Sequence, residues 1–129
     1  MYYSLVLLYH HIDNKYLIAG VKTEAGIDRI IPLHDKILQI SEKVYLNNRK
    51  ELSYQQYNKA FKKVMNILNL NSEHTPYDCR HTFATRMDNA GANKLCIKII
   101  MGHAIQDITD NVYTHKSLKE LLEAVNLLE

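Results

Sequence analysis

The segment HTPYDCRHTFATRM, residues 74–87, sets one arginine, Arg80, between two ring side chains, Tyr77 and His81. A guanidinium offers a planar fork of donors that fits a carboxylate or a phosphate. Arg80 falls at the border of an apolar stripe, so we expect it to be half withdrawn from water. Two interpretations remain open from this segment alone: an ion pair with a carboxylate, and a group held ready for an anion.

A helix must position these side chains. Thr75 and Asp78 have the spacing of a capping box, and Pro76 suits a first helical turn, so the helix is expected to begin at Pro76. Gly91 supplies a stop. The apolar stripe predicted for this helix consists of Cys79, Phe83, Met87 and Ala90.

Composition limits the classes of protein. A chain of 129 residues with 47% hydrophobic residues can bury one core, and one domain is expected. The formal charge of +2 is too small to indicate nucleic acid by itself. No phosphate-cradling glycine loop or HExxH motif is present.

The cysteines and histidines give no sign of a metal site. Cys79 and Cys96 lie in apolar helical patterns and are predicted to be reduced core residues. The histidines without metal spacing, which we expect to be solvated or structural, are His10, His11, His34 and His115.

The opening MYYSLVLLYHH matches neither a signal peptide nor a membrane span, so a cytoplasmic protein is expected.

The pattern of the whole chain predicts an α+β fold that is mainly helical, with a small antiparallel sheet near the N-terminus followed by a helical bundle. NKYLIAG and IDRIIPL are the expected strands. Helices are expected after Asp35, after Ser53 with its partner Gln56, and over NKLCIKIIMGH, where Gly102 ends the helix and leaves His103 just beyond it. A short helical turn is expected in DITDNVYTH. Ser117 with Glu120 is expected to cap the last helix, which carries Leu118, Leu121, Leu122, Val125 and Leu128.

Four ordered blocks, VKTEAGIDRIIPLHD, TPYDCRHTFATRM, IIMGH and NVYTH, resemble the catalytic domain of the tyrosine recombinases, the phage and transposon integrases, from about Asp13 to Leu122. The resemblance implies that a tyrosine hydroxyl attacks a DNA phosphate and leaves a 3′-phosphotyrosine and a free 5′-hydroxyl. It implies no metal and no cofactor. It also implies a cytoplasmic protein encoded by a bacterium or a prophage.

The resemblance assigns roles residue by residue. Tyr113 matches the nucleophile, and Arg80 the arginine that holds non-bridging phosphate oxygens. His103 matches the histidine that donates to the phosphate or assists proton transfer, and Lys22 the lysine that protonates the leaving 5′-oxygen. His81 is expected to support the site, and the predicted DNA contacts are Arg80, His81 and Lys22. The alternatives from residue type alone are an aromatic at a helix edge for Tyr113, a helix-end cap for His103 and a surface lysine for Lys22.

Two departures from the family pattern stand out. The family usually has histidine where this chain has Tyr77, which is therefore counted among the expected catalytic residues. A tyrosine donates a hydrogen bond to a phosphate but does not titrate near neutral pH, so acid–base help from this position is not expected. The family's first catalytic arginine would fall at or before Met1, and no arginine precedes Arg29, which matches a strand position. We therefore expect residues 1–129 to be a partial catalytic domain that lacks its beginning and the N-terminal DNA-binding domain.

The expected partners are double-stranded DNA attachment sites and other recombinase protomers, reached through the C-terminal helix, with no membrane. A second hypothesis is a non-catalytic DNA-binding remnant of an integrase. A third is a small helical interaction protein in which the motifs are coincidences. The type IB topoisomerases share the chemistry, but a Gly-His pair followed by YTH is more typical of an integrase.

Overall fold

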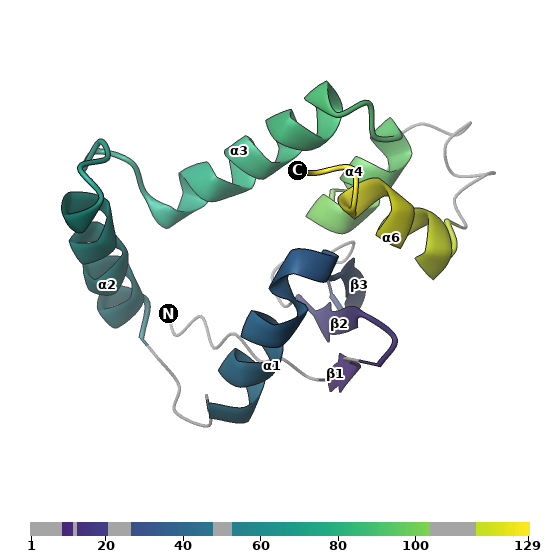
Figure 1. Ribbon diagram of the computed structural model, residues 1–129, viewed down its shortest axis with the longest axis horizontal. Coiled ribbons are helices and arrows are strands. Elements are labelled where there is room, and N and C mark those ends of the chain that lie inside the picture. Colours follow the sequence, from purple (N-terminus) through teal and green to yellow (C-terminus); the bar gives the residue numbers. More distant parts are fainter. Residues whose placement is uncertain (1–8, 12, 21–26, 48–52, 104–115) are drawn as a thin grey trace.

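The computed structural model describes residues 9–11, 13–20, 27–47, 53–103 and 116–129. A small sheet is followed by helices, as predicted, and Figure 1 shows the sheet on the same side of the molecule as the two helices α4 and α6. The elements are β1 (Tyr9–His11), β2 (Tyr16–Ala19), β3 (Arg29–Pro32), the 3₁₀ turn η2 (Asp35–Ile37), α1 (Leu38–Asn47), α2 (Tyr54–Ile67), α3 (Pro76–Asn89), α4 (Lys94–Met101) and α6 (Leu118–Val125).

The sheet has three antiparallel strands in the order β1-β2-β3. The two predicted strands are confirmed as β2 and β3, whereas β1 was not expected from the sequence. Ala19 pairs with Arg29 at the end of the β2–β3 pair where the two strands are connected, and Tyr16 pairs with Pro32 at the open end. The connection between β2 and β3 therefore leaves and re-enters the sheet beside Arg29.

Three helices begin at the predicted capping boxes. The backbone N–H of Ser53 donates to Gln56 Oε1 at 2.8 Å, and that of Ser117 donates to Glu120 Oε2 at 2.9 Å. In each box a serine hydroxyl accepts from the third helical N–H, so two orphan donors are satisfied together. These caps fix where α2 and α6 start; the third box opens α3, where the candidate site lies.

The core lies where α3, α4 and α6 meet. Met87 is fully buried, and it packs with Cys96 and Ile100 of α4 and with Leu121 of α6. Two members of the predicted α3 stripe do not join this core: Cys79 and Ala90 are exposed. The prediction that both cysteines are core residues is wrong for Cys79. The reason is length, since α4 has 8 residues and α3 has 14, so α4 cannot cover every turn of α3.

The C-terminal helix docks on its own chain. Leu121, Ala124 and Val125 are buried, and the residues that follow α6 are tied to distant parts of the fold. His34 Nε2 donates to the carbonyl of Leu128 at 2.8 Å, and an Arg86 Nη2 donates to the Glu129 carbonyl at 2.9 Å. His34 is therefore a structural residue, as expected.

The other helices are less covered. No residue of α2 is buried, and Figure 1 shows this helix at the far side of the molecule from the sheet. Its apolar face exposes about half of the side chains of Tyr57, Val64 and Leu68, at 50%, 51% and 59%. None of the helices among the described residues is long and apolar enough to cross a membrane.

Candidate functional site

The first turn of α3 is rigidly capped. The backbone N–H and the hydroxyl of Thr75 both donate to Asp78 Oδ2, at 2.7 and 2.9 Å. The N–H and hydroxyl of Thr75 stabilise the ionised carboxylate, so they lower the pKa of Asp78. Pro76 occupies the first helical position. As the sequence predicted, the helix begins at Pro76, and this cap sets the direction of the side chains in its next two turns.

Two of those side chains pair with each other on the outer side of α3. The rings of Tyr77 and His81 meet edge to face, with centroids 4.9 Å apart and an interplanar angle of 77°. Tyr77 is 63% exposed. The described contacts of Tyr77 thus lead to His81, one turn along the helix, and not to Arg80.

Arg80 points to the end of α4. Its Nη2 donates to the carbonyl of Met101, and the side chain is half-buried, as the sequence predicted. Within the part of the chain that the structure describes, no carboxylate forms an ion pair with Arg80. A carbonyl partner orients a guanidinium without neutralising it, so Arg80 keeps its full positive charge in the contacts that the described residues provide.

A tight turn at the end of α4 presents His103. Gly102 adopts the left-handed conformation, with φ 66°, and its N–H donates to Ile99 while the N–H of His103 donates to Lys98. This is the Schellman pattern of a helix C-terminus. His103 is exposed immediately after it, which confirms the predicted place of His103 just past the helix end.

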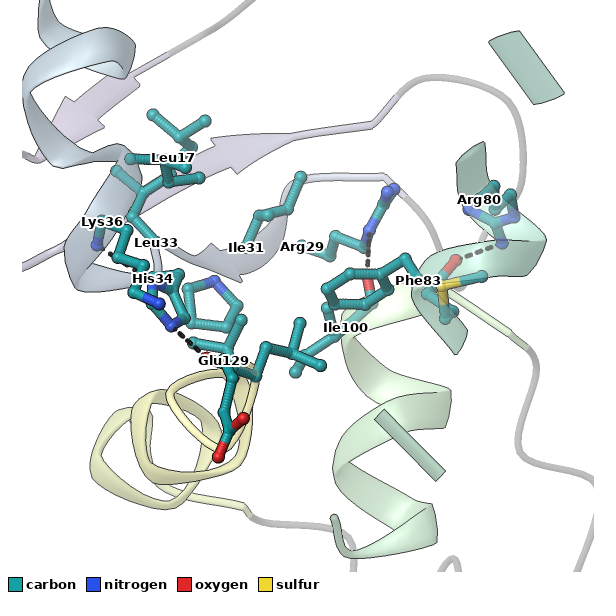
Figure 2. Close-up of a pocket in the computed structure, with 15 residues that line it drawn as sticks. Leu17, Arg29, Ile31, Leu33, His34, Lys36, Arg80, Phe83, Ile100 and Glu129 are labelled. Atoms are coloured by element: carbon teal, nitrogen blue, oxygen red, sulfur yellow. Dashed lines mark hydrogen bonds between the residues drawn. The ribbon is translucent and has the colours of Figure 1, made fainter. Parts of the chain in front are cut away.

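Two arginines complete the bonding of this helix end. An α-helix leaves its last four carbonyls without helical partners. In α4 the backbone N–H groups of the turn donate to the carbonyls of Lys98 and Ile99. Arg80 donates to the carbonyl of Met101, and Arg29 Nε donates to that of Ile100 at 3.1 Å. Figure 2 shows the two guanidinium groups reaching the same helix end from β3 and from α3.

The two positive charges affect each other. Partial burial and, second, the charge of Arg80 lower the pKa of Arg29. A guanidinium still remains protonated at neutral pH. Cations are favoured at a helix C-terminus because it carries a partial negative charge. The site therefore gathers two guanidinium groups where a short helix attracts them, next to an exposed imidazole.

An open cavity of about 580 Å³ lies behind the arginines. Arg29 and Arg80 border it at one end, and Figure 2 shows His34, Lys36 and Glu129 at the opposite end. Its remaining walls are largely aliphatic and aromatic side chains of the sheet, α3, α4 and the C-terminal tail. Such a lining suits no phosphate, so the candidate anion site is the end of the cavity bordered by the two arginines. His103 does not line the cavity and follows the helix end that both arginines bind.

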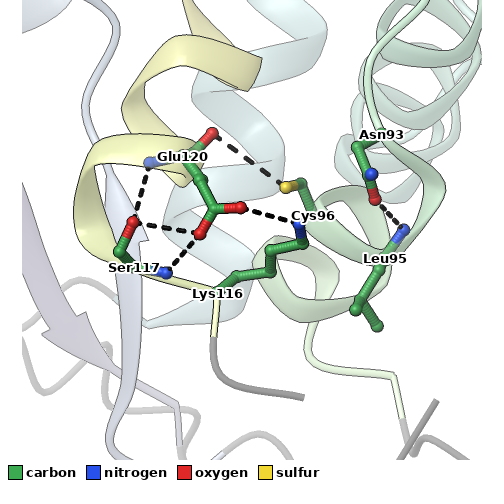
Figure 3. Close-up of polar contacts among 6 residues, drawn as sticks. All are labelled: Asn93, Leu95, Cys96, Lys116, Ser117 and Glu120. Atoms are coloured by element: carbon green, nitrogen blue, oxygen red, sulfur yellow. Dashed lines mark hydrogen bonds and ion pairs between the residues drawn. The ribbon is translucent and has the colours of Figure 1, made fainter. Parts of the chain in front are cut away.

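The start of α6 is fixed to α4 by a polar cluster (Figure 3). Lys116 Nζ lies 2.7 Å from Glu120 Oε1, and the sulfur of Cys96 lies 4.0 Å from the carbonyl of Glu120. The hydrogen bond from Lys116 and the two from Ser117 lower the pKa of Glu120 to about 2. This cluster fixes the chain just after residues 104–115.

Two predicted site residues, Lys22 and Tyr113, lie outside the described residues, and so does the short helix expected in DITDNVYTH. The segments that carry them are bounded by described residues: Gly20 and Ile27 on either side of Lys22, and His103 and Lys116 on either side of Tyr113. Among the residues that the structure describes, no three His, Cys, Asp or Glu side chains cluster as a metal site would require.

Comparison with known proteins identifies the family. The model of the phage integrase family matches residues 13–120. The chain belongs to this family, that of the tyrosine recombinases. Tyrosine recombinase XerC of Thermodesulfovibrio yellowstonii is 29% identical over 105 residues, which cover 81% of this chain and 35% of that protein. Tyrosine recombinase XerD of Staphylococcus aureus is 28% identical over 142 positions, which cover 93% of this chain and 48% of that protein.

A transposase is also similar to this chain. The transposase from transposon Tn916 of Enterococcus faecalis is 26% identical over 138 positions, which cover 88% of this chain and 34% of that protein. The chain thus spans about a third to a half of the length of these relatives. No solved structure matches the chain. The resemblance inferred from the four motifs is confirmed at the level of the family.

Arg29 was not predicted as a site residue. The sequence shows it only as a charged residue at the start of a strand, and its contact with Ile100 spans 71 positions of the chain. The only sequence signal for this contact was Gly102, and that signal is not specific. A glycine commonly ends a helix whether or not a side chain lies against it. The close approach of Arg29 to that glycine appears only in three dimensions.

Proposed function

We propose that this chain is part of the catalytic domain of a site-specific DNA recombinase that cleaves and rejoins strands through a phosphotyrosine at Tyr113. One observation carries the proposal: Arg80 of α3 donates to the carbonyl of Met101, two residues before His103, and forms no ion pair among the described residues. Cleavage of a phosphodiester builds negative charge on the non-bridging oxygens. An oriented guanidinium that keeps its charge is suited to that task.

Arg80 and His103 have complementary roles in this proposal. One Nη of Arg80 is anchored on the Met101 carbonyl, which fixes the plane of the guanidinium, so its other donors face the phosphate in a preset direction. His103 extends from the rigid turn that follows, and its imidazole donates to a phosphate oxygen or transfers a proton. His81 supports this edge of α3 through its contact with Tyr77.

In this proposal Lys22 protonates the leaving 5′-oxygen. Lys22 follows Ala19 by three positions in the sequence, and Ala19 pairs with Arg29, which donates to the carbonyl of Ile100 in α4. Tyr113 belongs to the segment between His103 and the anchored start of α6, so both of its ends are held by the α4–α6 unit.

Completion of the site requires a further arginine in this proposal. The relatives are two to three times longer than the part that they share with this chain, and no arginine precedes Arg29. We therefore propose that residues 1–129 act as a partial catalytic domain, with the remaining phosphate-binding arginine supplied from outside them. Its partners are DNA attachment sites and other protomers, and its location is the cytoplasm.

Covalent capture tests the proposal. The chain, alone and extended by the reading frame upstream of its gene, is incubated with nicked duplexes drawn from the DNA that flanks the gene, and adducts are resolved on denaturing gels. We expect an adduct from the extended protein and at least about 10²-fold less from residues 1–129, by analogy with loss of one oxyanion donor. Tyr113→Phe should abolish the adduct, and Tyr57→Phe, which changes an exposed tyrosine of α2, should not. An adduct that persists in Tyr113→Phe would exclude Tyr113 as the nucleophile.

A second candidate function is DNA binding without cleavage. It is favoured by Tyr77, which is largely exposed, pairs with His81, and stands where the family usually has a histidine. In this case the arginines bind phosphate, but Tyr77 does not supply the acid–base function of the histidine that the family usually has at its position. Binding that weakens steeply between about 50 and 200 mM salt, with no adduct from the extended protein, would favour this candidate.

A further inference from the structure

The turn after α4 is held from one side by a residue that no motif assigns. We propose that Arg29 is a positioning residue of the recombinase site, which holds the Gly102 turn so that His103 stands beside Arg80. The inference rests on the proposed function for the identity of the ligand, a DNA phosphate. The hold of Arg29 on the turn is independent of that ligand.

Arg29 acts on the turn in two ways. Its Nε donates to the carbonyl of Ile100, two residues before Gly102. Its side chain also lies flat against Gly102: a Cβ built on that glycine would meet Arg29 Cδ at 3.0 Å and Nε and Nη1 at 3.2 Å. The guanidinium thus covers the backbone that leads directly into His103.

The two arginines both bind the C-terminal end of α4. Arg80 and Arg29 bind consecutive carbonyls, those of Met101 and Ile100, from α3 and β3. With both bonds made, the end of α4 is fixed to a helix on one side and to the sheet on the other. Without Arg29, the Ile100 carbonyl loses this donor and the surface of Gly102 is uncovered, so the turn is held by Arg80 and its own backbone bonds alone.

The contact also holds one end of the β2–β3 pair against α4. Arg29 pairs with Ala19 at that end of the sheet and donates to the Ile100 carbonyl of α4. Loss of Arg29 would therefore loosen His103 relative to Arg80, although Arg29 itself need not touch the phosphate.

The test compares Arg29→Met and Arg29→Lys with a matched control, Arg86→Met. Arg86 lies in α3 and, like Arg29, donates to a backbone carbonyl, but its partner is Glu129 and not the last turn of α4. Hydrogen exchange of the Gly102 and His103 amides is measured by NMR in each protein. We expect exchange about tenfold faster in Arg29→Met, because a charge-assisted hydrogen bond is lost, an intermediate rate in Arg29→Lys, and no change in Arg86→Met.

A second measurement separates a positioning role from a merely structural one. The shift of the His103 ring resonances is followed while a short duplex is added at low salt. We expect a clear shift in the unaltered protein and in Arg86→Met, a loss of at least half of it in Arg29→Met, and partial recovery in Arg29→Lys.

The possible results have distinct meanings. Unchanged amide exchange in Arg29→Met would overturn the inference, and so would faster exchange with an undiminished response of His103 to DNA. If His103 of the unaltered protein does not respond to duplex DNA, the proposed function fails instead, and the exchange rates still decide whether Arg29 holds the turn.

Discussion

Gly102→Ala tests the packing of the candidate site with a single methyl group. Gly102 has φ 66°, and a Cβ there would lie 3.0 to 3.2 Å from three atoms of Arg29. The left-handed conformation costs an alanine about 1–2 kcal/mol relative to glycine. Moving Arg29 off the Ile100 carbonyl adds about 1–1.5 kcal/mol for a charge-assisted hydrogen bond that is only partly buried. We therefore expect the free energy of unfolding to fall by about 2–3.5 kcal/mol.

The chain supplies a matched control in Gly91→Ala. Gly91 ends α3 with φ 77° in the same Schellman pattern, since its N–H donates to Asp88 and that of Ala92 to Met87. A Cβ on Gly91 would meet nothing within 4 Å, so this substitution has only the conformational cost. Thermal unfolding followed by circular dichroism should show a lower Tm in both variants, by roughly 3–5 °C for each kcal/mol in a chain of this size. The decrease should be clearly larger for Gly102→Ala.

A double-mutant cycle attributes the difference to Arg29. In an Arg29→Ala background, Gly102→Ala should cost no more than Gly91→Ala does, because the side chain that it displaces is gone. Equal shifts for the two glycine variants in the native background would refute the close contact between Arg29 and the turn. A Gly102→Ala effect that survives unchanged in Arg29→Ala would refute it as well.

Three other predictions concern the surroundings of the site. Because the pKa of Glu120 is lowered to about 2 from 4.5, chiefly by Lys116, its stabilisation is present above about pH 4.5 and is lost as the pH falls toward 2; acid unfolding should be less steep in Glu120→Gln. Cys79 is exposed whereas Cys96 is 2% exposed with a pKa raised by burial, so a thiol reagent should modify Cys79 first and Cys96 only on unfolding. Deleting residues 126–129 should lower Tm by several degrees through the lost tail contacts, with no change of mass in light scattering; a changed mass would contradict docking within one chain.

Local signals in the sequence were sufficient for the helix boundaries. Capping boxes act within four residues, so Ser53, Thr75 and Ser117 mark the starts of α2, α3 and α6 without knowledge of the rest of the fold. Glycine in the left-handed region likewise marks the ends of α3 and α4. The place of His103 followed from these local rules, because a residue after a helix-ending glycine needs no tertiary information to be located.

Burial and long-range contacts did not follow from local rules. The three- and four-residue spacing of Cys79, Phe83 and Met87 puts them on one side of a helix, but only the partner helix decides which turns it covers, and α4 is too short for Cys79. β1 escaped notice because a strand of three residues gives little alternation to read. The contact of Arg29 with α4 depends on how the sheet packs on the helices, and the spacing of residues in the sequence does not indicate that packing.

The net charge of +2 gave no reason to expect a DNA-binding protein, and the site explains why it need not. Electrostatic attraction for a phosphate depends on the charges within about a Debye length, some 8–10 Å at ordinary salt, and not on the sum over the chain. At the end of α4 the helix contributes roughly half a negative charge, which offsets only part of the Arg80 guanidinium. The second guanidinium, that of Arg29, lies close enough to Arg80 for the charge of Arg80 to lower the pKa of Arg29, in addition to the larger effect of burial. An arriving phosphate relieves that repulsion, so the free energy gained on binding should depend on both arginines together, and replacement of either one should weaken the contribution of the other.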